Sequence, residues 1–454
     1  MRLTRKQLLA GAAASALGAG GIYELVDQLG GEAPARPVGL PRPAEQHLLD
    51  GVSVILDNDV EVVVPPLHHQ LVTANIRSGD VRSAQRELSD ALDELDARYE
   101  QTPAGLGLTL AWGLPYFERR VPEAWHAHAP YDRRARKAAL LPAVRFPSDP
   151  HEALLEENEV AILLRSDVRD HIVDAARVLF HDLSLFELTS VRRGFVGGGL
   201  PKKMAMTAGV PGADLIPHAA QLFLGFTSTQ KDALGPSLIA NHETLGFVDL
   251  GPKHYFRQGT SLHVSHLFED LEAWYLNFDF DERVATAFRP GQPDVRGGTL
   301  TVPQPLKRAD STRTVKREFA TQGRIGHSSS IQVSSRLQHD YAAEDGTVYK
   351  KGTAIPQRAD FNTLDNPFVW SSRPHIDALQ AGPRAGLHFV VFNPSSDDFH
   401  RNRLAMDGVL PDGTRLPLAA RARQQGFNSV LRTTHRQNFL VPPRRHQSFP
   451  LAEL

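Results

Sequence analysis

In the first half of the chain, an apolar run is followed by apolar residues at helical spacing and then by apolar residues that alternate. This order of patterns limits strongly which folds the chain can adopt. A short apolar run covers residues 71–76. After it, apolar side chains recur at the spacing of one helical face: Val81, Ala84, Leu88, Leu92, Leu95 and Tyr99. Asp80 stands just before this pattern and is expected to be the N-cap of the helix. Alternating apolar residues over 106–112 then predict a half-buried strand.

The same order recurs further along the chain. An apolar run at 160–164, a helical pattern at 172–183 and a strand candidate at 189–193 follow one another. In the second half, 221–226 and 260–264 are strand candidates, and 387–392 predicts a buried strand. Between them a helical face is expected from Leu267, Leu271, Trp274 and Phe278. Strand, helix and strand, repeated twice, is the order of a ferredoxin-like unit. We therefore expect an α+β fold of duplicated ferredoxin-like units, with antiparallel sheets and helices packed outside, of the dimeric α/β barrel type.

The organisation along the chain follows from these patterns. Residues 1–29 are interpreted as an export signal or N-terminal anchor, and the proline-rich residues 30–46 as a linker. Residues 47–215 would form the N-terminal ferredoxin-like domain, and 216–454 the C-terminal one. A polar stretch over 292–385 has little periodicity, and loops of that length usually carry function or are disordered.

The N-terminus has the pattern of a secretory signal. Arg2, Arg5 and Lys6 precede an uncharged run over 8–22 that is too short to span a bilayer. Residues 4–9 resemble a twin-arginine motif with lysine in place of the second arginine. We expect export to the periplasm, cell envelope or exterior by that route. Retention as a membrane anchor and a helix of the mature protein are the alternatives.

Composition excludes several kinds of chemistry. The 454 residues include no cysteine, which rules out disulfides, thiolate metal sites, a cysteine nucleophile and a cysteine-ligated haem. The formal net charge is −2, so no basic field exists to attract nucleic acid. His263 and His266, close to Glu269 and Asp270, would suit a metal only if they shared a helix face. Nothing in the sequence decides the oligomeric state.

Motifs in the second half follow one another in an informative order. Apolar residues and Gly225 precede Thr227 to Thr229, and a Gly-Thr strand and helix follow at 259–274. His327 then stands in Arg-Ile-Gly-His-Ser-Ser, and Arg358 in Pro-Gln-Arg-Ala-Asp-Phe. The last motif is the apolar strand at 385–393. This order resembles the C-terminal half of the dye-decolourising (DyP-type) haem peroxidases, and the resemblance extends more diffusely over 65–408.

The resemblance implies a haem b cofactor with hydrogen peroxide and an unidentified reductant as reaction partners. His327 matches the family's proximal iron ligand, for which a neutral imidazole nitrogen is needed. Arg358 matches the distal arginine, whose guanidinium would stabilise negative charge as the O–O bond breaks. The alternatives are a loop histidine with no ligand role, and an arginine at the surface or paired with a haem propionate.

One residue that the family uses is missing. The family carries Gly-x-x-Asp-Gly where this chain has Gly225 to Thr229, with Ser228 in place of the acid–base aspartate. A hydroxyl without a partner is a poor base near neutral pH. Asp360 or Asp365 is a candidate replacement. The chain is therefore expected to be either a peroxidase or a non-catalytic haem-binding or envelope protein on the same fold. A Soret band and peroxide turnover would separate these functions.

The N-terminal pattern gives a direct test of export. Residues 1–45 fused to a reporter that works only after export should give an active reporter, whereas the reporter alone should not. The reporter's activity in intact cells measures this. A fusion product that stays full-length in the cytoplasm would contradict the expectation.

Overall fold

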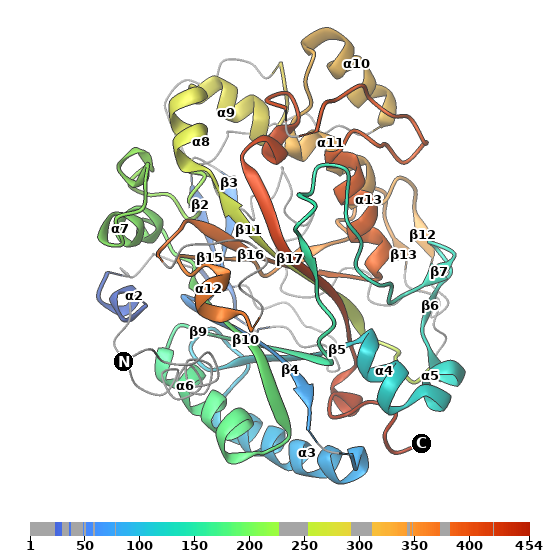
Figure 1. Cartoon of the computed structure of the whole chain (residues 1–454). Helices are drawn as coiled ribbons and strands as arrows, with labels where there is room; N and C mark the ends of the chain where they lie inside the picture. The colour runs from blue at the N-terminus through green and yellow to red at the C-terminus, as the bar shows by residue number, and fades with distance from the viewer. Residues whose placement is uncertain are drawn as a thin grey trace.

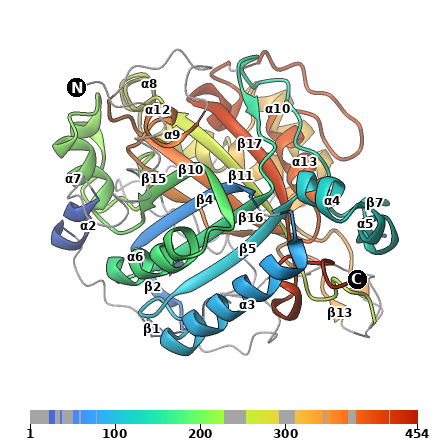
Figure 2. The same cartoon turned by 60° about the horizontal axis from the view of Figure 1, so that its bottom comes forward.

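The protein is described from a computed structural model, shown in Figure 1 and, turned by 60°, in Figure 2. The structure describes residues 23–29, 36–37, 49, 51–57, 60–77, 79–226, 253–291, 311–342, 346, 348–372, 382–420 and 422–454. None of the helices in these ranges combines the length and apolar character that crossing a membrane requires.

The first half forms a ferredoxin-like unit. Its elements run β4 (His68–Ile76), α3 (Val81–Arg98), β5 (Gly107–Gly113), β9 (Val160–Ser166), α6 (Arg169–Arg177) and β10 (Phe186–Phe195). The sheet order is β10-β4-β9-β5, with every neighbouring pair antiparallel. Asp80 caps α3 as expected, because its side chain accepts hydrogen bonds from the backbone of Arg82 and Ser83. The predicted βαββαβ order is confirmed here.

The second half repeats this arrangement with longer insertions. Its strands are β11 (Thr260–Glu269), β14 (Gln357–Arg358), β15 (Phe361–Thr363), β16 (Gly386–Asn393) and β17 (Leu431–Val441). β11 pairs antiparallel with both β16 and β17, and β16 pairs with β14 and β15. The order β17-β11-β16-β15 is the counterpart of the first sheet.

The two sheets join at both edges and close into a ring. β15 pairs with β10, and β17 pairs with β5. One apolar cluster lies inside this ring, because it draws residues from strands of both units: Leu71, Ala111, Leu163, Leu262, Phe361, Val390 and Phe439. The inner face of the ring is therefore buried between the two units, and helices lie over its outer face. The predicted α+β barrel of duplicated units is confirmed.

Helices cover the outside of the two units at opposite ends of the molecule (Figures 1 and 2). Over the first unit lie α3 and α6, whose apolar faces pack on β4, β5 and β9. Over the second lie α8 (Leu271–Asn277), α9 (Phe280–Ala287), α10 (Thr312–Gln322), α11 (His327–Ser335) and α13 (Ser396–Met406). The space between this second group and the sheet holds the candidate site.

Shorter elements complete the described chain. They are α2 (Glu24–Leu29), β1 (Arg36–Pro37), β2 (Ser53–Asp57), β3 (Val60–Val64), α4 (Leu114–Arg120), α5 (Pro122–His128), β6 (Tyr131–Asp132), β7 (Lys137–Ala138), β8 (Leu154–Leu155), α7 (Leu200–Thr207), β12 (Tyr341–Ala342), β13 (Val348–Tyr349) and α12 (Pro367–Trp370). A π-helical turn extends α6 over Val178–Asp182, and 3-10 turns lie at Ala213–Leu215, η4 (Gly426–Ser429) and Arg444–His446.

The segment before the proposed linker packs onto the body. The hydroxyl of Tyr23 hydrogen-bonds with Thr363 Oγ1 at 3.0 Å and accepts from the backbone N–H of Leu364 at 3.2 Å. Val26 is fully buried, and Asp27 pairs with His68 at 2.5 Å. Tyr23 therefore belongs to the folded unit. The proposed domain boundaries, including the one after residue 29, stay predictions.

One predicted strand is wrong. Residues 221–226 form turns, and Gly225 has a φ of +87°, which an extended strand does not allow. Side chains of α8 satisfy the carbonyls there: Trp274 Nε1 donates to Leu224 O at 2.8 Å and the Tyr275 hydroxyl to Phe223 O at 2.6 Å. The run is apolar because it packs under α8, and not because it joins a sheet. Leu267, which was assigned to the helix, lies in β11.

Candidate functional site

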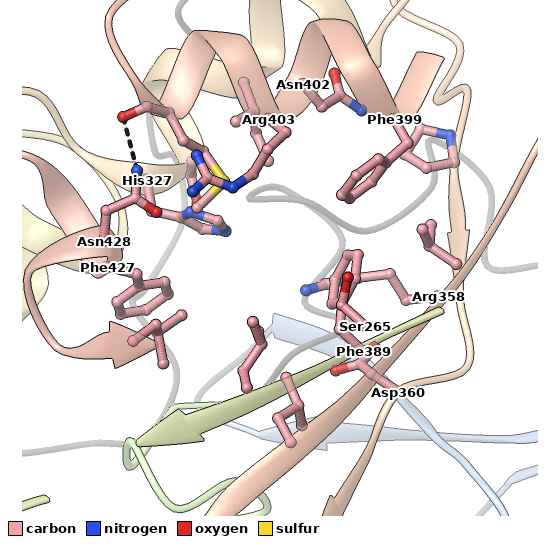
Figure 3. A pocket seen from close by; sticks show the side chains of 18 of the residues that line it. Ser265, His327, Arg358, Asp360, Phe389, Phe399, Asn402, Arg403, Phe427 and Asn428 are labelled. Atoms are coloured by element: carbon pink, nitrogen blue, oxygen red, sulfur yellow. Dashed lines mark hydrogen bonds between the residues drawn. The ribbon is translucent and has the colours of Figure 1, made fainter. Parts of the chain in front are cut away.

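A cavity lies between the outer face of the second sheet and the helices over it (Figure 3). It has a volume of about 160 Å³ and opens to solvent. Its walls are mostly apolar, with side chains from the sheet, the helices and the turn before residue 227: Leu222, Leu224, Phe226, Leu267, Phe288, Ile331, Leu387, Phe389, Val391, Phe399, Met406, Phe427 and Leu431. A mostly apolar cavity with a few polar groups is typical of a small-molecule site.

Strand alternation selects the residues of β11 that face this cavity. Ser265, Leu267 and Glu269 line it, whereas Leu262 and Val264 of the same strand lie in the barrel interior. Successive side chains of a strand point to opposite faces, so a strand buried on both faces supplies both surfaces. The cavity floor thus depends on the register that closes the ring.

His327 begins α11, and its backbone is held against the end of α9. Ser329 N donates to Phe288 O at 2.9 Å, and Ser328 Oγ donates to Ala287 O at 3.1 Å. Gly326 precedes His327, and a Cβ there would lie 2.5 Å from Phe288 O. Glycine is therefore required for this close approach.

The imidazole of His327 points into the cavity from one side (Figure 3). Its ring lies 4.6 Å from that of Phe427, centre to centre, and Nδ1 is buried with no hydrogen-bond partner among the described residues. Burial, together with the positive charges of Arg358 and Arg403, lowers the pKa of His327 to about 3. The ring is therefore neutral near pH 7, with a lone pair available to a metal ion.

Arg358 lies across the cavity from His327, together with Asp360, Ser265 and Phe389 (Figure 3). The pairing of β14 with β16 fixes it opposite Val391. Its Nη2 is buried with no hydrogen-bond partner among the described residues. Burial lowers the pKa of Arg358 and nearby Asp360 opposes that shift, so the guanidinium stays cationic in an apolar wall.

The cavity thus brings together His327, Arg358 and Asp360, which the sequence had singled out separately. Their roles stay predictions. Ser228 lies outside the described residues. Asp365 does not line the cavity; its Oδ2 lies 3.8 Å from Arg193 Nη2, near Tyr23, and its assignment as a replacement base is not supported by its position.

Sequence reasoning missed Glu269 as a cavity residue. It ends β11, and its Oε2 is buried with no hydrogen-bond partner in the described part of the chain. Burial, and then the negative charge of Asp360, raises the pKa of Glu269 to about 8. Counting alternate positions along a strand from Ser265 would have placed Glu269 on the same face, but the strand had been expected to end at residue 264.

The earlier metal hypothesis for His263 and His266 is not supported by the structure. Both lie in β11, three residues apart, so their rings point to opposite faces. His263 hydrogen-bonds with Asn438 and Ser265, each at 2.6 Å, while His266 contacts Thr434 Oγ1 at 2.7 Å on the other side. Within the ranges that the structure describes, no three residues of metal-ligating type gather.

Ion pairs hold the polar edge of the cavity. Asp149 accepts hydrogen bonds from Arg436, and from Arg403 Nη2 at 3.2 Å, while Arg403 Nη1 donates to Asp407 at 2.8 Å. Burial opposes ionisation of Asp149, but the two guanidinium groups outweigh it and lower its pKa. Arg403 and Arg436 both line the cavity, so this network fixes two cations at its wall.

Comparison with known proteins identifies the family. A family model described as "Family of unknown function (DUF7405)" matches residues 66–443. The chain belongs to this family. No curated protein matches the sequence.

The DUF7405 chain is similar in structure to several dye-decolourising peroxidases. A DypB variant from Rhodococcus jostii RHA1 in complex with heme has a TM-score of 0.51 at 11% identity, covering 85% of this chain and 96% of that one. A dye-decolorizing peroxidase from Bacteroides thetaiotaomicron has a TM-score of 0.51 at 11% identity, covering 87% and 97%. The encapsulated DyP-type peroxidase from Mycobacterium smegmatis has a TM-score of 0.50 at 12% identity, covering 85% and 95%. The DUF7405 chain therefore has the dye-decolourising-peroxidase fold.

The arginine–aspartate network at the cavity edge gives a stability prediction. Asp149→Asn should lower the free energy of unfolding by roughly 3–5 kcal/mol, because it leaves two buried guanidinium groups without their shared counter-charge. Urea denaturation at pH 7 measures this.

Glu157→Gln is the matched control, since the exposed Glu157 lies 3.5 Å from the exposed Arg119. A surface pair of that kind contributes about 0–1 kcal/mol. Equal effects of the two substitutions would contradict the importance of the buried network.

Proposed function

We propose that this DUF7405 protein is an exported haem b-binding protein of the dye-decolourising-peroxidase type that uses hydrogen peroxide to oxidise a donor. One observation carries the proposal. A neutral imidazole, His327, and a guanidinium with an unpartnered nitrogen, Arg358, face each other across an apolar cavity. The R. jostii DypB variant, which has the same fold, is in complex with heme.

The residues around the cavity suit a haem. An apolar lining accommodates the faces of a large flat ring, and a neutral imidazole is a usual axial ligand of iron. At the edge of the cavity, polar groups that could bind the carboxylate side chains of a haem come from Asn402 and Arg403 of α13 and from Arg436 of β17. His327 would hold the cofactor, which supplies the redox chemistry when bound.

Arg358 would act on the substrate from the opposite side. Hydrogen peroxide accepts two electrons and two protons and leaves as two water molecules, while the donor loses the electrons. Negative charge develops on the peroxide oxygens as their bond breaks. A fixed guanidinium in an apolar wall stabilises that charge without reorganising water.

A second function is favoured by a specific observation. An iron-bound imidazole usually donates its second N–H to an acceptor, which raises its basicity. Nδ1 of His327 has no acceptor among the described residues, and the charges that act on the ring are guanidinium groups. Such a ligand donates electrons weakly, which, together with Ser228 in place of the family's aspartate, supports a haem-binding protein without turnover. An envelope protein that has lost the cofactor is the third alternative.

Haem binding is tested at the ligand. His327→Ala should lose the haem or shift its Soret band strongly, because the iron loses its protein ligand. Added imidazole should restore the band, which separates ligand loss from misfolding. Absorption spectra after reconstitution with haem measure both effects.

His400→Ala is the control, because His400 lies on α13 beside the cavity but does not line it. It should keep the wild-type spectrum. An unchanged spectrum in His327→Ala would remove the ligand assignment, and a wild type that takes up no haem would favour the envelope protein.

Turnover is tested at the opposite wall. Arg358→Leu should slow the reaction with hydrogen peroxide by about 10²–10³-fold, since one fixed charge donor is removed. Haem uptake should stay at the wild-type level, and Arg358→Lys should lose less. Stopped-flow mixing of the haem-loaded protein with peroxide measures the rate. A haem-loaded wild type that does not react would favour the non-catalytic alternative.

A further inference from the structure

Packing alone does not explain the position of Glu269, which carries a buried carboxyl group. It lies in the cavity wall at the end of β11, 8% exposed, with Oε2 unpartnered among the described residues. Burying a polar oxygen without a hydrogen bond costs free energy. A glutamine or an apolar residue would fill the same wall at less cost, so the carboxyl group calls for a chemical explanation.

Its neighbours in the cavity form an acid–base environment. The charged and titratable groups around it are Asp360 from the segment between β14 and β15, Arg358 from β14, His327 from α11, and Arg403 and Arg436 at the edge. Outside the cavity, Tyr275 of α8 is close enough for Glu269 to raise its pKa. The pKa of Glu269 itself, about 8, is raised by burial and by Asp360.

Two carboxyl groups in one cavity therefore have different environments. The negative charge of Asp360 acts on Glu269, while the positive charge of Arg358 lies beside Asp360. A pair of carboxyl groups of which one has a pKa close to neutral pH is typical of sites that move protons.

We infer that Glu269 is the acid–base residue of this cavity and takes the place of the aspartate that the Gly225 to Thr229 motif lacks. This inference rests on the proposed peroxidase function. The ionised carboxylate accepts the proton of one peroxide oxygen and returns it to the other oxygen. When the O–O bond breaks, the protonated oxygen leaves as water. The remaining oxygen takes up two electrons, which the donor supplies by way of the cofactor, and two protons from solvent, and it leaves as the second water.

Asp360 and Ser228 are the other candidates for this role. Asp360 lies close to Arg358 and has further interactions of its own, so it is not free. Ser228 is a hydroxyl, which needs a partner base. Glu269 combines an unengaged oxygen with exposure to the cavity.

The first experiment needs no cofactor. Infrared difference spectra of the haem-free protein between pH 6 and pH 9.5 should show loss of a protonated-carboxyl band. That band should be absent in Glu269→Gln, present in Glu272→Gln, and shifted to a lower midpoint pH in Asp360→Asn, which removes the nearby negative charge. Glu272 is an exposed residue in the first turn of α8. A band that persists in Glu269→Gln would overturn the assignment.

The second experiment uses the haem-loaded protein. Glu269→Gln should keep the Soret band but react with peroxide about 10²–10⁴-fold more slowly, and Glu269→Asp should lose less. The wild-type rate should rise with pH through about 8, as the carboxyl ionises, and this rise should vanish in Glu269→Gln.

The outcomes separate this inference from the proposed function. A wild type without haem or without peroxide reaction contradicts both of them. A reactive wild type whose rate and pH profile are unchanged in Glu269→Gln overturns the inference alone, and leaves Asp360 or Ser228 as the base.

Discussion

Backbone pairing between the two units is the constraint on which the rest of the structure depends. β17 pairs with β11 of its own unit and with β5 of the other, and β15 pairs with β10. The ring that results buries most of both faces of its strands. Inside it the units share one apolar cluster, and a second cluster outside it packs helices against the sheet. The cavity lies between the sheet and the helices over it, mainly α11 and α13.

The same closure explains the charges at the site. Strand alternation commits Ser265, Leu267 and Glu269 to the cavity once their neighbours face the barrel interior. A carboxyl group placed in an apolar wall by this register is desolvated, which raises its pKa, and a histidine or arginine there has its pKa lowered. The cavity therefore holds a neutral imidazole, a cationic guanidinium and a carboxyl group that titrates near pH 8.

Much of the fold could be predicted from spacing. The helix after Asp80, the alternation at 106–112 and the apolar run at 387–392 coincide to within one residue with α3, β5 and part of β16, because each element buries residues at regular spacing. The strand predicted at 221–226 was wrong because carbonyls of this segment accept hydrogen bonds from the side chains of Trp274 and Tyr275, which are distant in sequence. A pattern of apolar residues reports burial, but it does not report which partner satisfies the backbone.

The sequence by itself determined the element order, the duplicated α+β architecture and the residues His327, Arg358 and Asp360 as candidates for one site. The element order and the architecture follow from local periodicity, and the three residues follow from the resemblance of the motifs to the dye-decolourising peroxidases. Only the tertiary structure decided that the sheets close into a ring, that His263 and His266 face apart, and that Glu269 shares the cavity with Asp360. Those results depend on strand register and on contacts between distant residues, and a shift of one residue would reverse every face.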